Sequence, residues 1–138
     1  MKKHWAADLV GKPWEPGASG PDSFDCWGLV RYVQKKYFDR HVPKIGFDRR
    51  AIIDMFSSTD ILKQWTEITR KDSLVEGDCI IMSPSRNPIH VGVIIYIDNM
   101  FGVLHSIEPV GVIYVTMSDL SMSGWITQRL YRWSACSD

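Results

Sequence analysis

The sequence lacks the features that mark membrane, secreted or nucleic-acid-binding proteins. Sixteen basic residues balance sixteen acidic ones among 138, and no local basic run attracts a nucleic acid or an anionic membrane. No apolar run approaches the roughly 20 residues that a membrane span requires. Residues 1–5 are partly basic, but no apolar stretch follows them, so they do not resemble a secretory signal. We therefore expect a chain made for the cytosol, or one that leaves it without such a signal.

Cysteine is scarce. The chain contains Cys26, Cys79 and Cys136, an odd and sparse set that does not indicate a disulfide framework and suits a reducing compartment. We expect Cys79 inside a strand and Cys136 in a terminal tail. Two of the four histidines, His4 and His41, stand in polar surroundings and are expected to be exposed.

No internal repeat or low-complexity linker divides the chain, so residues 1–138 are expected to form a single domain. Helices are predicted at residues 2–10, from Phe24 to Phe38, and at 49–56. Strands are predicted in five later stretches that are rich in Val, Ile and Tyr and bounded by turn residues: 79–83, 89–97, 101–107, 111–116 and 126–133. This order predicts an α+β fold, with N-terminal helices packed on a C-terminal antiparallel sheet.

Cys26 is expected in the first turn of the second helix, where Asp22-Ser23 offers an N-cap and Asp25 adds a negative charge. A thiol attacks only as the thiolate, and the N-terminal end of a helix favours that anion. Cys26 is therefore a candidate nucleophile. A small buried hydrophobe is the alternative that its position leaves open.

His90 opens the most apolar strand of the chain, where an imidazole needs a polar partner. Gly92 is expected on the same face, leaving room beside the ring for a thiol or a substrate. His105 lies on the next strand, and a hairpin turning at residues 99–100 puts it on the His90 face. A third polar group of this kind orients a catalytic base.

The spacing within that hairpin opposes the pairing of the two rings. A tight turn pairs His105 with Ile94, which lies four residues, or roughly 13 Å, along the strand from His90. We therefore expect only a looser turn or a bulge to bring the rings together. Glu108 or a backbone carbonyl is the alternative orienting group.

Four segments in order resemble the NlpC/P60 peptidases. Residues 11–17 and 24–30 resemble the family's opening, and they are most similar to a phage-associated branch with an Asp-Cys-Trp-Gly-Leu nucleophile motif. Residues 90–93 are similar to the family's histidine strand, and residues 104–106 to the strand of its third residue. Gly77-Asp78 before a strand also matches. The resemblance covers about residues 9–120.

This resemblance implies a papain-like core and a cysteine endopeptidase with a Cys26–His90–His105 triad and no cofactor. The implied substrate is the stem peptide of bacterial peptidoglycan, cleaved between γ-D-glutamate and diaminopimelate or lysine. Asp25 matches an acidic residue thought to meet the substrate's free amino group. The phage-associated branch implies phage tail proteins as further partners, with incorporation in a virion tail or delivery to the cell wall.

The sequence also departs from the family pattern. Trp14 stands where many relatives have Tyr and Trp27 where many have Ser, and both are candidate substrate contacts. The spacing of 64 residues between Cys26 and His90 is longer than in compact members.

Three alternatives to this peptidase remain open. The first is a zinc site of Cys26, His90 and His105, although no C-x-x-C or H-x-x-x-H pair supports it. The second is a module of a tail or cell wall that kept the fold and lost activity. The third is an amidase or acyltransferase acting on small amides or lipids.

Overall fold

The computed structural model describes residues 3–43, 64–70, 73–84 and 90–134. Within them six strands form one antiparallel sheet in the order β1-β6-β2-β3-β4-β5. The strands are β1 (Trp65–Ile68), β2 (Cys79–Pro84), β3 (His90–Ile97), β4 (Met100–Ile107), β5 (Gly111–Thr116) and β6 (Trp125–Trp133). The helices are the 3-10 helix η1 (Trp5–Asp8) and the α-helices α1 (Cys26–Phe38) and α4 (Met117–Met122).

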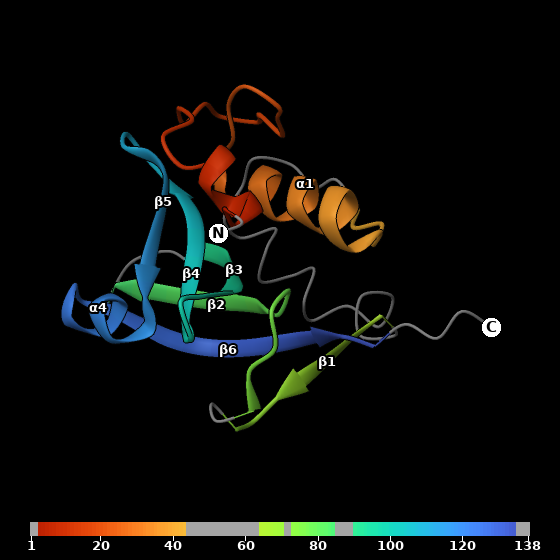
Figure 1. The fold of residues 1–138 in the computed structure, drawn as a ribbon, viewed down its shortest axis with the longest axis vertical. Coiled ribbons are helices and arrows are strands. Elements are labelled where there is room, and N and C mark those ends of the chain that lie inside the picture. Colours follow the sequence, from red (N-terminus) through yellow and green to blue (C-terminus); the bar gives the residue numbers. More distant parts are fainter. Residues whose placement is uncertain (1–2, 44–63, 71–72, 85–89, 135–138) are drawn as a thin grey trace.

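The predicted α+β fold is confirmed, since helices pack on an antiparallel sheet (Figure 1). All five predicted strands are present, and none of their ends differs from the prediction by more than one residue. The predicted helix at residues 2–10 is wrong in kind and length, because a four-residue 3-10 turn stands there. The predicted helix at 49–56 lies outside the described residues. β1 and α4 were not predicted.

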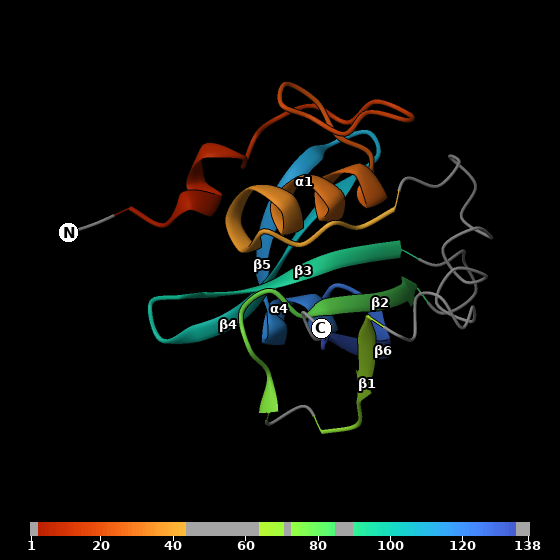
Figure 2. The same cartoon turned by 90° about the vertical axis from the view of Figure 1, so that its right-hand side faces the viewer.

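An apolar cluster lies on each face of the sheet. α1 packs against β3 and β4 (Figure 2), and the cluster beneath it contains Leu29 of the helix with Val91 and Val93 of β3. The other cluster contains Ile94 of β3 and Leu120 of α4. Alternate residues of β3 therefore serve opposite faces, as the two-residue period of a strand requires.

The turn between β3 and β4 sets the register of the candidate site. Ile97 pairs with Met100, so the loop is Asp98-Asn99, one residue earlier than predicted. Both loop residues have positive φ, 53° and 64°, as a type I′ turn requires. Val93 consequently pairs with Leu104. The next residue, His105, falls opposite Gly92 rather than opposite Ile94.

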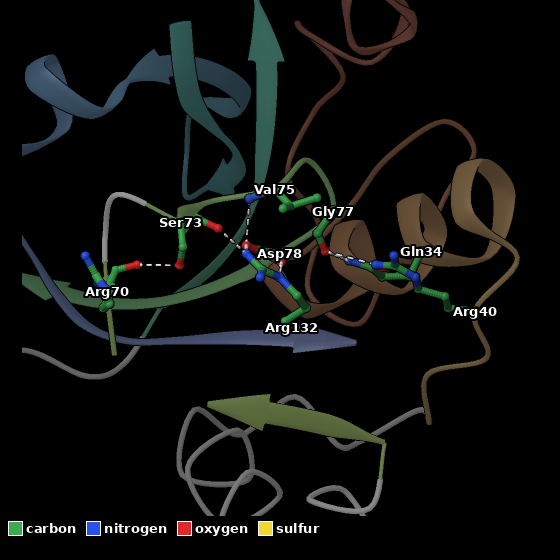
Figure 3. Close-up of polar contacts among 8 residues, drawn as sticks. All are labelled: Gln34, Arg40, Arg70, Ser73, Val75, Gly77, Asp78 and Arg132. Atoms are coloured by element: carbon green, nitrogen blue, oxygen red, sulfur yellow. Dashed lines mark hydrogen bonds and ion pairs between the residues drawn. The ribbon is translucent and has the colours of Figure 1, made fainter. Parts of the chain in front are cut away.

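A polar network holds the start of β2 to β6 and to the end of α1 (Figure 3). Arg132 of β6 donates from Nε to Asp78 Oδ1 at 3.0 Å and from Nη2 to Oδ2 at 2.8 Å. Gln34 of α1 donates its side-chain amide to the Gly77 carbonyl at 2.9 Å. The two-point contact between Arg132 and Asp78 fixes the geometry of the pair as well as stabilising it. The Gly77-Asp78 turn therefore anchors the sheet.

Candidate active site

Cys26 is the first residue of α1, and Asp25 is its N-cap. The Asp25 Oδ1 atom accepts the Gly28 N–H at 2.5 Å, and Oδ2 accepts the Gly17 N–H at 3.0 Å. The predicted cap at Asp22-Ser23 is therefore wrong by two to three residues, because the Asp25 carboxylate takes that role. The half-buried Cys26 thiol stands at the helix end, where unpaired N–H groups and the macrodipole favour a thiolate.

The Asp25 carboxyl is only 7% exposed. Burial raises the pKa of Asp25, while the hydrogen bonds from Gly28 and Gly17 and the charge of Arg31 act in the opposite direction. Both of its oxygens are bonded to backbone N–H groups. The structure thus places Asp25 as a helix cap, and its contact with a substrate amine stays a prediction.

The chain entering α1 is tied to β4 by a buried hydrogen bond. Ser106 donates its hydroxyl to the Phe24 carbonyl at 2.8 Å, and the Phe24 side chain is fully buried. The Phe24 N–H donates to the Pro13 carbonyl at 3.0 Å. Ser106 directly follows His105, and Phe24 lies two residues before Cys26. This bond therefore fixes the helix start relative to the strand that carries His105.

His90 and His105 are hydrogen-bonded to each other. The distance between His90 Nε2 and His105 Nδ1 is 2.9 Å, with the ring planes 73° apart. The expectation that a tight turn separates the rings is wrong, because the earlier turn moves His105 two residues closer along β3. A Cβ built on Gly92 would lie 2.6 Å from Val103 Cγ1 and 3.1 Å from His105 Cβ. The space beside Gly92 is thus occupied by β4 and is not left for a thiol or substrate.

His105 is fully buried, and burial lowers its pKa from 6.5 to about 4. It is therefore neutral at ordinary pH. Its Nε2 atom has no hydrogen-bond partner among the described residues. A neutral ring with its proton on Nε2 offers the Nδ1 lone pair to a donor, so His105 can accept an N–H from His90.

The ring of Trp125, which the sequence analysis missed, covers the histidine pair. Its centroid lies 5.0 Å from that of His90, tilted by 33°, and 5.8 Å from that of His105, edge-on at 82°. Trp125 is the first residue of β6 and lies 35 residues beyond His90 in the sequence. Nothing in its local sequence signals this contact, which depends on the pairing of β6 with β2.

The two histidine side chains and the body of α1 lie on opposite faces of the sheet. Val91 and Leu104, which neighbour the histidines, pack in the cluster beneath α1. His90 and His105 therefore lie on the alternate face. The end of α1 that begins with Cys26 lies on the same side as the start of β3 (Figure 2). A contact between the thiol and His90 has to be made there, at the strand end, and belongs to the function proposed below.

The remaining predicted site residues have other surroundings. Trp27 is 4% exposed in the core and donates its indole N–H to the Pro43 carbonyl at 3.0 Å. Trp14 is half-buried and forms an isolated bridge with Phe24. Their contacts with a substrate stay predictions. Glu108 is exposed beyond the end of β4, and His105 is the residue bonded to His90.

Two expectations about isolated residues have mixed outcomes. His4 is half-buried rather than exposed, since its Nε2 atom lies 2.8 Å from Glu76 and its Nδ1 atom accepts the Ala6 N–H. His41 is exposed and Cys79 is fully buried, as predicted. Burial raises the pKa of the Cys79 thiol, which makes it a poor nucleophile. Cys136 lies outside the described residues.

The zinc alternative finds no supporting geometry in the described part of the chain. No three His, Cys, Asp or Glu side chains there are gathered to hold a metal ion, so the zinc alternative has no donor set among them. Over the same residues, no helix has the length and apolarity to cross a membrane.

Fold and side chains together define a class of protein: an α+β domain with a cysteine at a helix start and two bonded histidines on adjacent strands. The NlpC/P60 family model matches residues 11–132, and the chain therefore belongs to the NlpC/P60 family. Family members are generally cysteine peptidases and cell-wall hydrolases. No curated protein gives a significant match to the sequence.

Two similar solved structures have the same fold. NlpC2 from Trichomonas vaginalis superposes with a TM-score of 0.64 at 21% identity, over 93% of this chain and 43% of that one. NlpC1 from the same organism gives 0.64 at 22% identity, over 93% of this chain and 41% of that one. This chain thus spans less than half the length of either.

Proposed function

We propose that the protein is a cysteine endopeptidase that hydrolyses an amide bond in the stem peptide of bacterial peptidoglycan. The bond is of the γ-D-glutamyl–diamino acid type, and Cys26, His90 and His105 form the triad. The observation that carries this proposal is the 2.9 Å hydrogen bond between His90 Nε2 and His105 Nδ1. It matches the base and its orienting partner in a thiol hydrolase.

In the proposed mechanism His90 takes the Cys26 proton on Nδ1, because Nε2 is directed at His105. The thiolate attacks the amide carbonyl carbon, and backbone N–H groups at the start of α1 stabilise the oxyanion. His90 then gives its proton to the departing amine, which leaves a thioester on Cys26. Water, deprotonated by His90, releases the acid and restores the thiol.

The neutral state of His105 has a definite part in this cycle. When His90 is an imidazolium, both of its ring nitrogens are donors, so its partner has to accept. Burial keeps the pKa of His105 at about 4, and its Nδ1 therefore remains an acceptor while His90 gains and loses its proton. A second cation at 2.9 Å would oppose the imidazolium instead.

The substrate side of the proposal concerns Asp25, Trp14 and Trp27. Asp25 supplies negative charge beside the thiol, where a free amino group of the stem peptide would bind. The half-buried Trp14 supplies a flat apolar surface near the helix start. Trp27 is buried in the core, so its proposed effect on the substrate is indirect, through the position of α1. The proposed setting is a phage tail or another route to the cell wall, with tail proteins as partners.

Digestion of defined muropeptides tests the proposal. Wild type and the Cys26→Ala and Cys136→Ala variants are incubated with stem peptides, and the products are read by mass spectrometry. We expect cleavage after γ-D-glutamate by wild type and Cys136→Ala, and none by Cys26→Ala. Cleavage by Cys26→Ala, or no cleavage by folded wild type, would refute the proposal. An activity on small amides instead would favour the amidase alternative.

A further inference from the structure

We propose that Trp125 is a positioning residue that shields the His90–His105 hydrogen bond from water and holds the His90 ring in its bonded orientation. This inference rests on the proposed function, in which that bond orients the base. It concerns a residue on a third strand, remote in sequence from both histidines.

The first observation is that one indole contacts both partners of one hydrogen bond. The Trp125 ring is tilted by 33° against His90, with centroids 5.0 Å apart, and meets His105 edge-on at 5.8 Å. Both distances are typical of packed aromatic pairs. His105 is fully buried, whereas Trp125 is half-buried. The indole therefore forms part of the layer between the hydrogen bond and solvent.

The second observation is a β-bulge that directs Trp125 to the histidine face. Ile81 of β2 pairs with Arg129, but Met82 pairs with Thr127, so Gln128 is an extra residue in β6. The pairing then continues to Pro84 and Trp125, which places Trp125 on the face of Met82, and Met82 pairs with His90.

Without the bulge, Ile126 would lie opposite Pro84 and Trp125 would face α1. Bulges often redirect a side chain beside an active site. Gln128 donates to the Ser83 hydroxyl at 2.9 Å, which holds the bulge in place. Two independent features, ring contacts and strand register, thus point to the same role.

The physical effect of the cover follows from what surrounds His105. The residues beside His105 are His90 of β3, Ile113 of β5 and Trp125 of β6. The acidic residue of α4, Asp119, is exposed.

In the proposed triad the Cys26 thiol, at the start of α1, lies on the far side of His90 from His105. Burial is the cause that lowers the pKa of His105 to about 4, so no neighbouring charge maintains it. Opening the cover to water would therefore raise that pKa toward 6.5.

The variants are Trp125→Phe, which keeps a ring, and Trp125→Leu, which keeps apolar bulk without a ring. Trp133→Leu is the matched control, because Trp133 is also a half-buried tryptophan of β6 but packs edge-on against Trp65 at 5.4 Å. Activity on muropeptides is measured against pH, and the His105 pKa is measured by NMR titration of the imidazole signals.

For Trp125→Leu we expect kcat to fall about tenfold or more with little change in KM, since the change misorients the base His90 but leaves the binding of the substrate unaffected. The acid limb of the pH profile should move to higher pH, and the NMR pKa of His105 should rise by about one unit. Trp125→Phe should keep most of the activity, and the pKa of His105 should rise by less than in Trp125→Leu. Trp133→Leu should leave both the pH profile and the His105 pKa unchanged.

A folded Trp125→Leu variant with wild-type rate and profile would overturn the inference while leaving the proposed function intact. If Trp125→Leu does not fold, Trp125→Phe decides through the NMR titration: its His105 pKa should still rise, by less than one unit, and an unchanged pKa would overturn the inference. If wild type cleaves no muropeptide, the proposed function fails. The NMR titration then decides alone: an unchanged His105 pKa in the Trp125 variants refutes the shielding role, and a raised one supports it.

Discussion

Acidification below pH 6.5 should destabilise this protein through His105. Burial lowers the pKa of His105 from 6.5 to about 4 in the folded protein. The unfolded chain takes up its proton near the ordinary value, so within this window it binds more protons than the folded state. The stability present above pH 6.5 is therefore lost progressively as the pH falls, and the loss levels off below about 4.

The size of this effect follows from the shift. One pKa unit corresponds to about 1.4 kcal/mol, so a shift from 6.5 to about 4 corresponds to about 3 kcal/mol. Small domains are stable by about 5–15 kcal/mol, and such a loss is easily measured against that. Solvent does not screen this shift, because the His105 side chain is 0% exposed.

Urea unfolding at several pH values between about 7 and 4 measures the loss, with His105→Gln as the test variant. Glutamine keeps an acceptor for His90 but does not titrate, so its free energy of unfolding should fall by about 3 kcal/mol less than that of wild type. Carboxylates titrate similarly in both proteins and cancel in the difference. His41→Gln, which removes an exposed histidine, should behave as wild type. An equal loss in wild type and His105→Gln would show that His105 is not buried in its neutral form.

Three further outcomes test the candidate site. Iodoacetamide at about pH 6.5 should label Cys26 before Cys136, because the helix start favours the Cys26 thiolate; equal labelling, or preference for Cys136, contradicts this. His90→Ala should lower turnover by about a hundredfold or more while leaving the fold intact, since general-base catalysis typically contributes that factor; normal turnover in a folded variant would make His90 only a strand residue. Ser106→Ala removes the 2.8 Å bond to the Phe24 carbonyl and should cost about 1 kcal/mol in urea unfolding, with reduced turnover. Unchanged stability and turnover would show that this bond does not hold the helix start.

The strands could be predicted from the sequence because their periodicity reflects burial directly. β3 has five consecutive buried residues from Val91 to Ile95, packed on both faces, and reads as an apolar run between turns. β1 is only four residues long, and two of its middle residues are exposed. α4 buries Leu120 alone and is too short to show a helical period. These two elements are held mainly by the strands beside them.

The sequence names the candidate residues but not their geometry. Position alone makes Cys26, His90 and His105 candidates, the resemblance to the family joins them as a triad, and the pattern puts the turn between their strands one residue too late. A shift of one residue at both ends of a hairpin moves the partner by two, from Ile94 to Gly92. The position of Trp125 depends on a bulge at Gln128, and an extra residue in a ladder leaves no mark in a single sequence. Pairing between distant strands decides both contacts.

The placement of the helix start has a further consequence for the proposed chemistry. Had α1 begun at Phe24, Cys26 would lie within the first turn and its thiol on the side of the helix. Because Asp25 is the cap, Cys26 is the first helical residue and its thiol stands at the end of α1. Only the end of α1 can meet His90, since the imidazoles face away from the cluster beneath the helix body. The cap residue and the Ser106–Phe24 bond thus decide whether the thiol and its base can meet, although neither exchanges a proton in the proposed reaction.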